Sequence, residues 1–306
     1  MKTNISLILI LCLLLGACKN GNASSQSKSE TPQDTIKAIK MPAIPQMMTA
    51  PEQRADFLAK HYWDNVNFAD TNYIHHPEVT EQAWADYCDL LNHVPLETAQ
   101  QAMRNVIDRT NVDKKVFTYI TDLADKYLYD PNSPMRNEEF YIPVLEAMIA
   151  SPVLNETEKI RPQARLKLAQ KNRIGTKALN FTYTLASGAQ GSLYQLKAEY
   201  LLLFINNPGC QACTETIEGL KNAPIINQLL QEKKLVLLSI YPDEELDEWK
   251  KHLSEFPNEW INGYDKKFTI KEEQVYDLKA IPTLYLLDKD KTVLLKDATA
   301  PAIEAY

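Results

Sequence analysis

Apolar residues between positions 51 and 172 recur every three or four residues, which is the spacing of one face of an α-helix. The clearest runs are Phe57, Leu58, His61, Tyr62 and Asn65, then Trp84, Tyr87, Cys88 and Leu91, then Phe117, Ile120, Leu123, Ala124 and Tyr127. Glycine is absent from this segment, and we expect its prolines to mark helix boundaries: Pro77, Pro95, Pro131, Pro134, Pro143 and Pro152. The pattern predicts an all-helical domain of about five or six helices over residues 51–172.

After Gly175 the pattern changes to short apolar runs that alternate with helical ones, which is typical of an α/β sheet. Near-continuous apolar runs at 200–205 and 234–241 predict central strands that are covered on both faces. The other expected elements are strands at 181–185 and 193–196, a helix over 210–220 continuing through 225–231, a helix over 244–255, a hairpin of 283–287 with 292–295, and a short final helix at 300–306. The second half of the chain is therefore expected to be an α/β domain over residues 175–306.

The first seventeen residues have the features of a signal peptide. A single charge, Lys2, precedes an apolar run at 5–15 that is too short to span a bilayer. The run leads into Leu-Gly-Ala-Cys at 15–18, which resembles the lipobox of bacterial lipoproteins. This resemblance implies cleavage before Cys18 and attachment of a lipid to its thiol. The alternative is an ordinary cleaved signal peptide followed by an unrelated cysteine.

Residues 18–50 contain no aromatic side chain and are rich in Ser, Gln, Lys, Thr and Pro. Such a composition buries too little apolar surface to repay the entropy of ordering. We therefore expect a flexible tether between the lipid on Cys18 and the helical domain. No other stretch of the chain is long and apolar enough to span a bilayer, so the chain is expected to be anchored rather than membrane-spanning.

Charge and cysteine content narrow the function. A formal charge of −7 and a pI near 5.4 argue against nucleic acid as a partner, because such binding needs a basic face. Five cysteines are too few for a disulfide scaffold. After signal cleavage and lipidation, Cys88, Cys210 and Cys213 would remain as thiols in an exported protein. A close pair would oxidise there unless it took part in redox exchange.

A Cys-x-x-Cys sequence, Cys210 to Cys213, directly follows the 200–205 run and stands at the expected start of a helix. The free N–H groups and dipole of a helix N-terminus stabilise a thiolate, which favours Cys210 as the attacking nucleophile. Cys213 lies one turn further into the helix and is placed to resolve a mixed disulfide. Half of a zinc site is the alternative, but the chain has no second pair, and His252 is the only histidine in this half.

A second motif, Ala280-Ile281-Pro282-Thr283, opens a later apolar run, although proline removes a hydrogen-bond donor from a strand. A strand, a Cys-x-x-Cys helix and a later Ile-Pro-Thr before an apolar hairpin together resemble the thioredoxin fold, and more narrowly the TlpA/ResA-like periplasmic thioredoxins. The resemblance covers residues 175–306. It implies that Pro282 is cis and packs beside Cys210 and Cys213, and that Ile281 offers its backbone to an extended substrate. The alternative for Pro282 is an ordinary strand-opening proline.

The helical half resembles, in arrangement and texture, a helical domain of unknown function that precedes thioredoxin-like domains in lipoproteins of Bacteroidota-type bacteria. Two positions depart from the thioredoxin pattern. Gly209 stands where the family has Trp, and Phe204 stands where classical thioredoxins have a buried acid that assists the second cysteine. Proton transfer from Cys213 would then need water or another group.

We interpret the chain as a lipid-anchored thiol:disulfide oxidoreductase that needs no cofactor and no metal. The Gln211-Ala212 pair carries no cation, which favours a reductase or isomerase. The expected partners are thiols and disulfides of exported proteins, an inner-membrane electron donor and the membrane itself. We expect a periplasm-facing protein of the cell envelope, because the residues after Cys18 lack an acidic run of the kind associated with surface export. We expect its anchor in the outer rather than the inner membrane.

The alternative function is a non-catalytic binding or assembly lipoprotein, in which the helical domain captures a partner and the thioredoxin-like domain is a scaffold. Three other features are expected to be structural. Cys88 should be an inert core thiol, the aromatic residues Tyr62, Trp63 and Phe68 should pack in the core, and His75 and His76 should lie in a solvated loop rather than a metal site.

Overall fold

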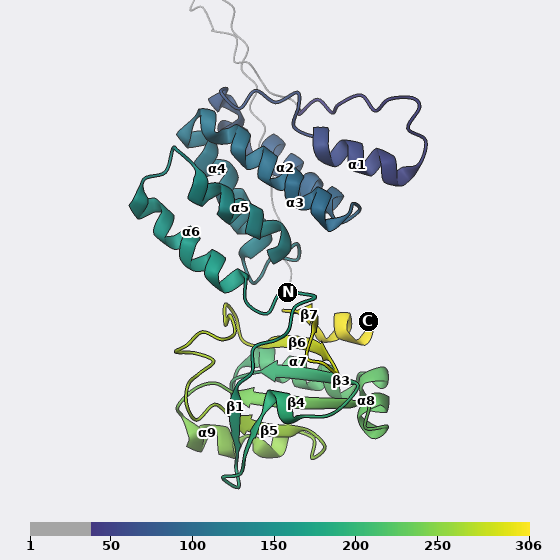
Figure 1. The fold of residues 1–306 in the computed structure, drawn as a ribbon, viewed down its shortest axis with the longest axis vertical. Helices are drawn as coiled ribbons and strands as arrows, with labels where there is room; N and C mark the ends of the chain where they lie inside the picture. The colour runs from purple at the N-terminus through teal and green to yellow at the C-terminus, as the bar shows by residue number, and fades with distance from the viewer. Residues whose placement is uncertain (1–37) are drawn as a thin grey trace, which may run out of the picture. The chain divides into compact units, whose positions relative to one another are not determined.

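The computed structural model describes residues 38–306, and its first half is helical, as predicted (Figure 1). The proposed signal peptide, Cys18 and the first part of the tether lie outside the described residues. The α-helices are α1 (Pro51–His61), α2 (Pro77–Leu91), α3 (Leu96–Arg109), α4 (Lys114–Ala124), α5 (Glu138–Ala150) and α6 (Glu156–Ala169). Short 3₁₀ turns at Thr71–His75 and Thr110–Val112 and a π-helical turn at Asp125–Tyr129 connect them.

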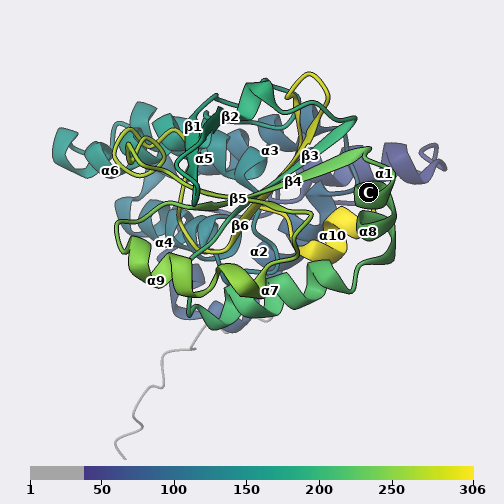
Figure 2. The ribbon, with the colours of Figure 1, turned by 90° about the horizontal axis from the view of Figure 1, so that it is seen from below.

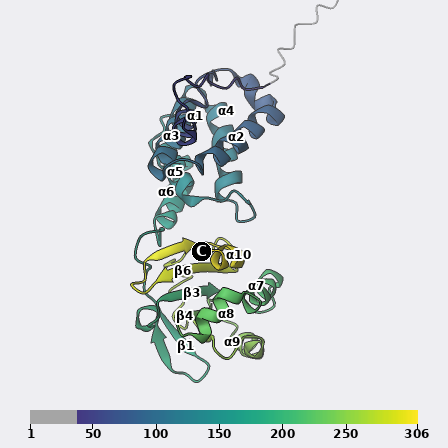
Figure 3. The same ribbon diagram turned by 90° about the vertical axis from the view of Figure 1, so that its right-hand side faces the viewer.

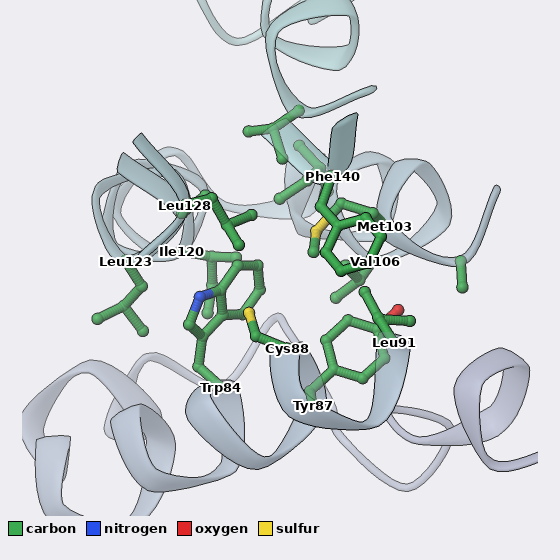
Figure 4. Packing of buried hydrophobic residues seen from close by; sticks show 14 of the residues in the cluster. Trp84, Tyr87, Cys88, Leu91, Met103, Val106, Ile120, Leu123, Leu128 and Phe140 are labelled. Atoms are coloured by element: carbon green, nitrogen blue, oxygen red, sulfur yellow. The ribbon is translucent and has the colours of Figure 1, made fainter. Parts of the chain in front are cut away.

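The core of the helical region forms around one face of α2. Figure 4 shows Trp84, Tyr87, Cys88 and Leu91 pointing from this helix into a cluster of side chains from α3, α4 and α5. All four are at most 2% exposed. The aromatic residues Tyr62, Trp63 and Phe68 are buried in the same cluster, as predicted. The helical spacing of apolar positions thus identified the runs at 84–91 and 117–124 correctly. Of the residues predicted in the run at 57–65, only Tyr62 is buried, and Asn65 is exposed beyond the end of α1.

Pro143 is an exception to the predicted helix boundaries, because it lies inside α5. A proline within a helix leaves the carbonyl oxygen four residues earlier without its N–H partner. Here that oxygen belongs to Glu139, and Gln100 Nε2 of α3 donates to it at 3.1 Å. A side chain from the neighbouring helix therefore replaces the missing backbone donor, and α5 continues through the proline.

The second half forms a seven-stranded sheet in the order β2-β1-β5-β4-β3-β6-β7. Its strands are β1 (Thr182–Leu185), β2 (Gln190–Ser192), β3 (Tyr200–Ile205), β4 (Leu235–Tyr241), β5 (Ile261–Tyr264), β6 (Thr283–Asp288) and β7 (Val293–Lys296). β3, β4 and β5 run parallel, whereas β6 pairs with β3 in the antiparallel direction. The central runs at β3 and β4 are buried along almost their whole length, as predicted.

Alternate residues of the central strands serve two separate cores. Leu202, Phe204 and Leu237 face the layer of α7 (Gln211–Lys221), α8 (Pro224–Gln231) and α10 (Ala300–Glu304). Leu203 and Ile240 face the other way, against loop residues such as Phe181 and Tyr276. Figures 2 and 3 show α7, α8, α9 (Leu246–Lys251) and α10 on one side of the sheet. The helix that carries the cysteine pair therefore packs on a rigid strand layer.

Several predicted elements of the sheet domain need correction. Residues 193–196 are not a strand. Leu193–Gln195 forms a 3₁₀ turn, which Ser192 and Gln195 cap, and the strand precedes it as β2. The predicted continuation of the first helix is a separate helix, α8, which begins at Pro224. The predicted helix over 244–255 is shorter, because it divides into α9 and a 3₁₀ turn, Leu253–Glu255. The sequence pattern missed β5 altogether.

Candidate active site

The pairing of two strands brings the two sequence motifs together. In the antiparallel register of β3 and β6, Ile205 at the end of one strand lies opposite Thr283 at the start of the other. The segment leading to Cys210 therefore leaves β3 at the same end of the sheet at which Ile281 and Pro282 lead into β6. Loops at the carboxyl end of parallel strands are the usual place for sites in such sheets.

Cys210 caps the N-terminus of α7. Its Sγ accepts the backbone N–H of Cys213 at 3.4 Å, in the way that a Ser or Asp side chain caps a helix. The preceding Gly209 has φ +72°, in the left-handed region where a side chain is unfavourable. Glycine suits this backbone conformation, which would be strained for tryptophan.

Ile281 and Pro282 lie beside the cysteine, as the resemblance to thioredoxin implies. The peptide bond between them is cis. The Cys210 thiol donates to the carbonyl oxygen of Ile281, with a sulfur–oxygen distance of 3.7 Å. Ile281, Pro282 and Cys210 are all partly exposed, so the segment and the thiol lie together at the surface.

Cys213 is placed differently from Cys210, because it is only 2% exposed. Its Sγ accepts the backbone N–H of Asn207 at 3.5 Å. Burial raises the pKa of Cys213 to about 12, and the hydrogen bond from Asn207 offsets only part of that effect. Both cysteines are free thiols. The site thus pairs an accessible sulfur with a buried, protonated one.

Comparison with known proteins shows the family to which the chain belongs. It is similar to a thioredoxin-like protein from Bacteroides caccae ATCC 43185 of known crystal structure, with 84% identity and a TM-score of 0.87, covering 89% of this chain and 98% of that chain. A family model described as a domain of unknown function (DUF5106) matches residues 17–172, and one described as thioredoxin-like matches residues 198–293. The chain belongs to the DUF5106 family and carries a thioredoxin-like C-terminal domain. The helical region is therefore the DUF5106 domain.

Two other solved structures are similar to the thioredoxin-like domain alone. The C-terminal domain of an uncharacterized protein from Bacteroides fragilis NCTC 9343 is 70% identical, over 44% of this chain and 96% of that chain, with a TM-score of 0.44. The thioredoxin domain of a thiol-disulfide oxidoreductase from Bacteroides vulgatus is 20% identical, over 44% and 96%, with a TM-score of 0.39. No curated protein matches the chain.

Phe204 fills the place of the buried acid of classical thioredoxins. It is fully buried in β3, and its ring packs edge-on against Trp260 with 6.4 Å between ring centroids. A buried polar pair lies close by in the chain: Asn206, which directly follows β3, donates to Ser239 of β4 at 2.8 Å. Neither side chain carries a charge at neutral pH. The thioredoxin-like domain therefore keeps the two thiols but has an aromatic ring where the acid would lie.

Sequence reasoning missed a charged group beside this site. Asp243, just after β4, accepts hydrogen bonds from Asn207 Nδ2 at 2.9 Å and Lys271 Nζ at 2.6 Å. Burial alone raises the pKa of Asp243, but these two hydrogen bonds bring it below its usual value. An acid held ionised in this way is a weak base, so it does not replace the missing proton acceptor.

Asp243 belongs to an acidic cavity of about 540 Å³ next to the loop before Cys210. Its lining includes Asn207, Pro208 and three further acidic side chains, Glu244, Glu245 and Glu248. A sequence signal for Asp243 did exist. β3 and β4 are neighbouring parallel strands, so the polar residues that follow each of them must meet at one edge.

The remaining candidates lie away from this site. Cys88 is 2% exposed in the helical core, and burial raises its pKa far above the usual range, which disfavours the reactive thiolate form. His75 belongs to the partly exposed 3₁₀ turn and His76 follows it directly. Over residues 38–306, no three or more His, Cys, Asp or Glu side chains are grouped to hold a metal ion. In the same range, no helix is long and apolar enough to cross a membrane.

Proposed function

We propose that this protein is a thiol:disulfide oxidoreductase that acts on disulfides of exported proteins. In this proposal Cys210 is the nucleophile, Cys213 is the resolving thiol, and the backbone at Ile281 and Pro282 holds an extended segment of the client. The observation that carries the proposal is the position of the Cys210 sulfur. It caps a helix, is partly exposed and lies 3.7 Å from the Ile281 carbonyl oxygen, while its partner thiol is buried.

The proposed reaction proceeds by two exchanges. The Cys210 thiolate attacks one sulfur of a client disulfide, so that a mixed disulfide forms and one client thiolate leaves. Cys213 then loses its proton to water and attacks the Cys210 sulfur, which forms the Cys210–Cys213 disulfide and releases the second client thiolate. The protein gives up two electrons, and a membrane dithiol donor restores the reduced pair. The helix start at Cys210 stabilises the thiolate that attacks in the first exchange.

The direction of exchange is proposed from the two residues between the cysteines. Gln211 and Ala212 carry no positive charge, and the Gln211 side chain hydrogen-bonds to Glu215 at 2.9 Å. Strongly oxidising pairs owe their potential to a highly stabilised thiolate. The absence of a cation in this pair favours reduction or isomerisation of clients.

Disulfide reduction tests the activity. The full-length chain in detergent micelles is mixed with insulin and dithiothreitol, and precipitation of the insulin B chain is followed. We expect the wild type to accelerate precipitation and both Cys210→Ser and Cys213→Ser to fall to the uncatalysed rate. Cys88→Ala, which removes the buried third thiol, is the matched control and should keep the activity. A wild type no faster than dithiothreitol alone, or a fully active Cys210→Ser, would reject the proposal.

We also propose that the protein is anchored through lipid on Cys18 and faces the periplasm from the outer membrane. The anchor rests on the lipobox-like sequence at 15–18, and the orientation rests on the lack of an acidic run after Cys18. Labelled palmitate should enter the wild type and not Cys18→Ala, which should become soluble after cell lysis. A wild type without label in the soluble fraction would contradict the anchor.

A non-catalytic binding or assembly role is the second candidate. Phe204 in place of the acid favours it, because resolution by Cys213 then has no charged side chain to take its proton. Failure of the insulin assay with retained folding would favour this role.

A further inference from the structure

Lys279, two residues before Ile281, carries its ammonium group into the protein interior. Its side chain is only 6% exposed. The Nζ atom lies 2.7 Å from Glu138 Oε1, 3.4 Å from Asp277 Oδ2 and 3.6 Å from Asp297 Oδ2. Burial alone lowers the pKa of Lys279, but the three carboxylates raise it above its usual value. The buried group is therefore a cation that carboxylates hold in place.

Glu138 is the member of this cluster that comes from the DUF5106 domain. It is the first residue of α5, and its side chain is 11% exposed. While Oε1 faces Lys279, the Oε2 atom pairs with Lys296 of β7. One carboxylate of the helical domain thus holds two lysines of the thioredoxin-like domain. A buried ion pair strongly constrains its partners, because separating them leaves an unpaired charge away from water.

The constraint reaches the candidate site through a short length of backbone. Only Ala280 separates Lys279 from Ile281, whose carbonyl oxygen accepts from Cys210. On the other side, Thr283 Oγ1 donates to the Ala280 carbonyl oxygen at 2.6 Å. The segment at 280–282 is therefore held at both ends, by the sheet after it and by Lys279 before it.

Other contacts from the helical domain reach the earlier part of the same loop. Lys171 Nζ donates to the carbonyl oxygen of Gln274 at 2.5 Å, and Asn172 Nδ2 donates to that of Val275 at 2.8 Å. These contacts end at least four residues before Lys279. Glu138 is the charged contact from the helical domain that lies next to the Ile281–Pro282 segment.

We propose that Glu138 is a positioning residue for the thioredoxin-like site. By holding Lys279, it keeps the Ile281–Pro282 segment in the arrangement that presents the Ile281 backbone to an extended client. The DUF5106 domain thereby sets how well protein disulfides are recognised, although it contributes no atom to the exchange. This inference rests on the proposed function and deepens it.

The effect should depend on the substrate. A protein client pairs its backbone with Ile281, so a displaced segment weakens its recognition. A small disulfide such as hydroxyethyl disulfide has no backbone to pair and needs only access to the Cys210 sulfur. A purely structural role of Glu138 would lower both activities together, since both then report the same loss of folded protein.

The test compares Glu138→Gln with Glu139→Gln in the full-length chain in detergent micelles. Glu139 is a matched control. It is the next residue of α5, has a side chain that is 15% exposed and pairs with Arg173 instead of a lysine beside the site. For Glu138→Gln we expect kcat/KM for insulin to fall by roughly three- to tenfold, mainly through KM, because misplacing a positioned group is costly. Its rate with hydroxyethyl disulfide, and both rates for Glu139→Gln, should stay at wild-type values.

A double-mutant cycle tests whether Glu138 acts on the site through Lys279. If Glu138 acts through Lys279, Lys279→Gln should show the same insulin-specific defect, and the double variant should add nothing to it. Should Glu138→Gln fail to fold, Glu138→Asp keeps the charge with a shorter side chain and should show a weaker, still insulin-specific defect.

The two proposals fail in different ways. Equal losses for insulin and the small disulfide, or no loss in any Glu138 or Lys279 variant, would overturn the positioning role and leave the activity standing. A wild type inactive on both substrates would reject the proposed function and this inference with it.

Discussion

At the scale of single residues, the two cysteines of the site differ in their exposure to solvent. Cys210 is partly exposed, whereas Cys213 and Cys88 are each 2% exposed. The sequence predicted this order for Cys210 and Cys213, because the first cysteine of the motif stands at a helix start and the second lies a turn inside. It also predicted the burial of Cys88 correctly, since helical spacing places it beside Trp84 and Leu91.

This difference predicts how the thiols react with iodoacetamide. At pH 7 Cys210 should be labelled first, while Cys213 and Cys88 stay unlabelled until urea is added. Raising the pH to 9 should not label Cys213, because its pKa near 12 keeps it protonated at both values. Peptide mass spectrometry measures each site, and denatured protein, in which all three thiols react, is the control. Labelling of Cys213 as fast as that of Cys210 would contradict this description.

The charged residues around the site were harder to foresee. Glu138 and Lys279 are charged residues that in sequence look like any others on a surface. Each side chain is largely buried against the other, although they are 141 residues apart in the chain. Periodicity reports which face of an element is buried, but it cannot report which distant charge meets another.

At the scale of elements, α7 and the loop before it contain two glycines with opposite requirements. Gly209 has φ +72°, whereas Gly219 lies within the helix, where an added Cβ would meet only the Ala300 Cβ, at 3.7 Å. The left-handed backbone at Gly209 disfavours any side chain, while helical backbone at Gly219 favours alanine over glycine.

The two glycines therefore predict stability changes of opposite sign. Gly209→Ala should lower the free energy of unfolding by about 1–2 kcal/mol, the cost of left-handed backbone with a Cβ. Gly219→Ala should raise it by about 0.5–1 kcal/mol, because alanine loses less backbone entropy in a helix. Urea denaturation of the full-length variants followed by circular dichroism measures both. Two shifts of the same sign would contradict the backbone assignment at Gly209.

Elements with a long, regular apolar pattern were predictable from the sequence. Elements that are short, or that depend on a contact from elsewhere in the chain, were not. β3 was predicted to the residue and β4 to within one, because both are long apolar runs. The predicted helix boundary at Pro143 was wrong. The sequence does not reveal that Gln100, from another helix, donates to the carbonyl oxygen that the proline leaves without a partner. β5 is only four residues long and includes Gly263, whose close approach to Tyr183 the sequence does not reveal.

At the scale of the whole molecule, the sequence predicted two regions of different architecture, and the comparisons identify them as a DUF5106 domain and a thioredoxin-like domain. It left the role of the helical domain open. Glu138, Lys171 and Asn172 contact the loop that leads into the cis peptide. Each contact joins a residue of the helical domain to a residue of the thioredoxin-like domain. The apolar pattern of one domain alone could therefore not predict it.

The central claim is that Cys210 and Cys213 form a reversible redox pair. The measurement that tests it most directly is titration of the full-length chain in glutathione buffers of graded potential, with the thiol and disulfide forms counted by mass after acid trapping. We expect a single two-electron transition between about −120 and −270 mV, the range of thioredoxin-fold pairs, which disappears in Cys210→Ser and persists in Cys88→Ala. A pair that stays reduced in the most oxidising buffer, or a disulfide that forms equally in Cys210→Ser, would contradict the account.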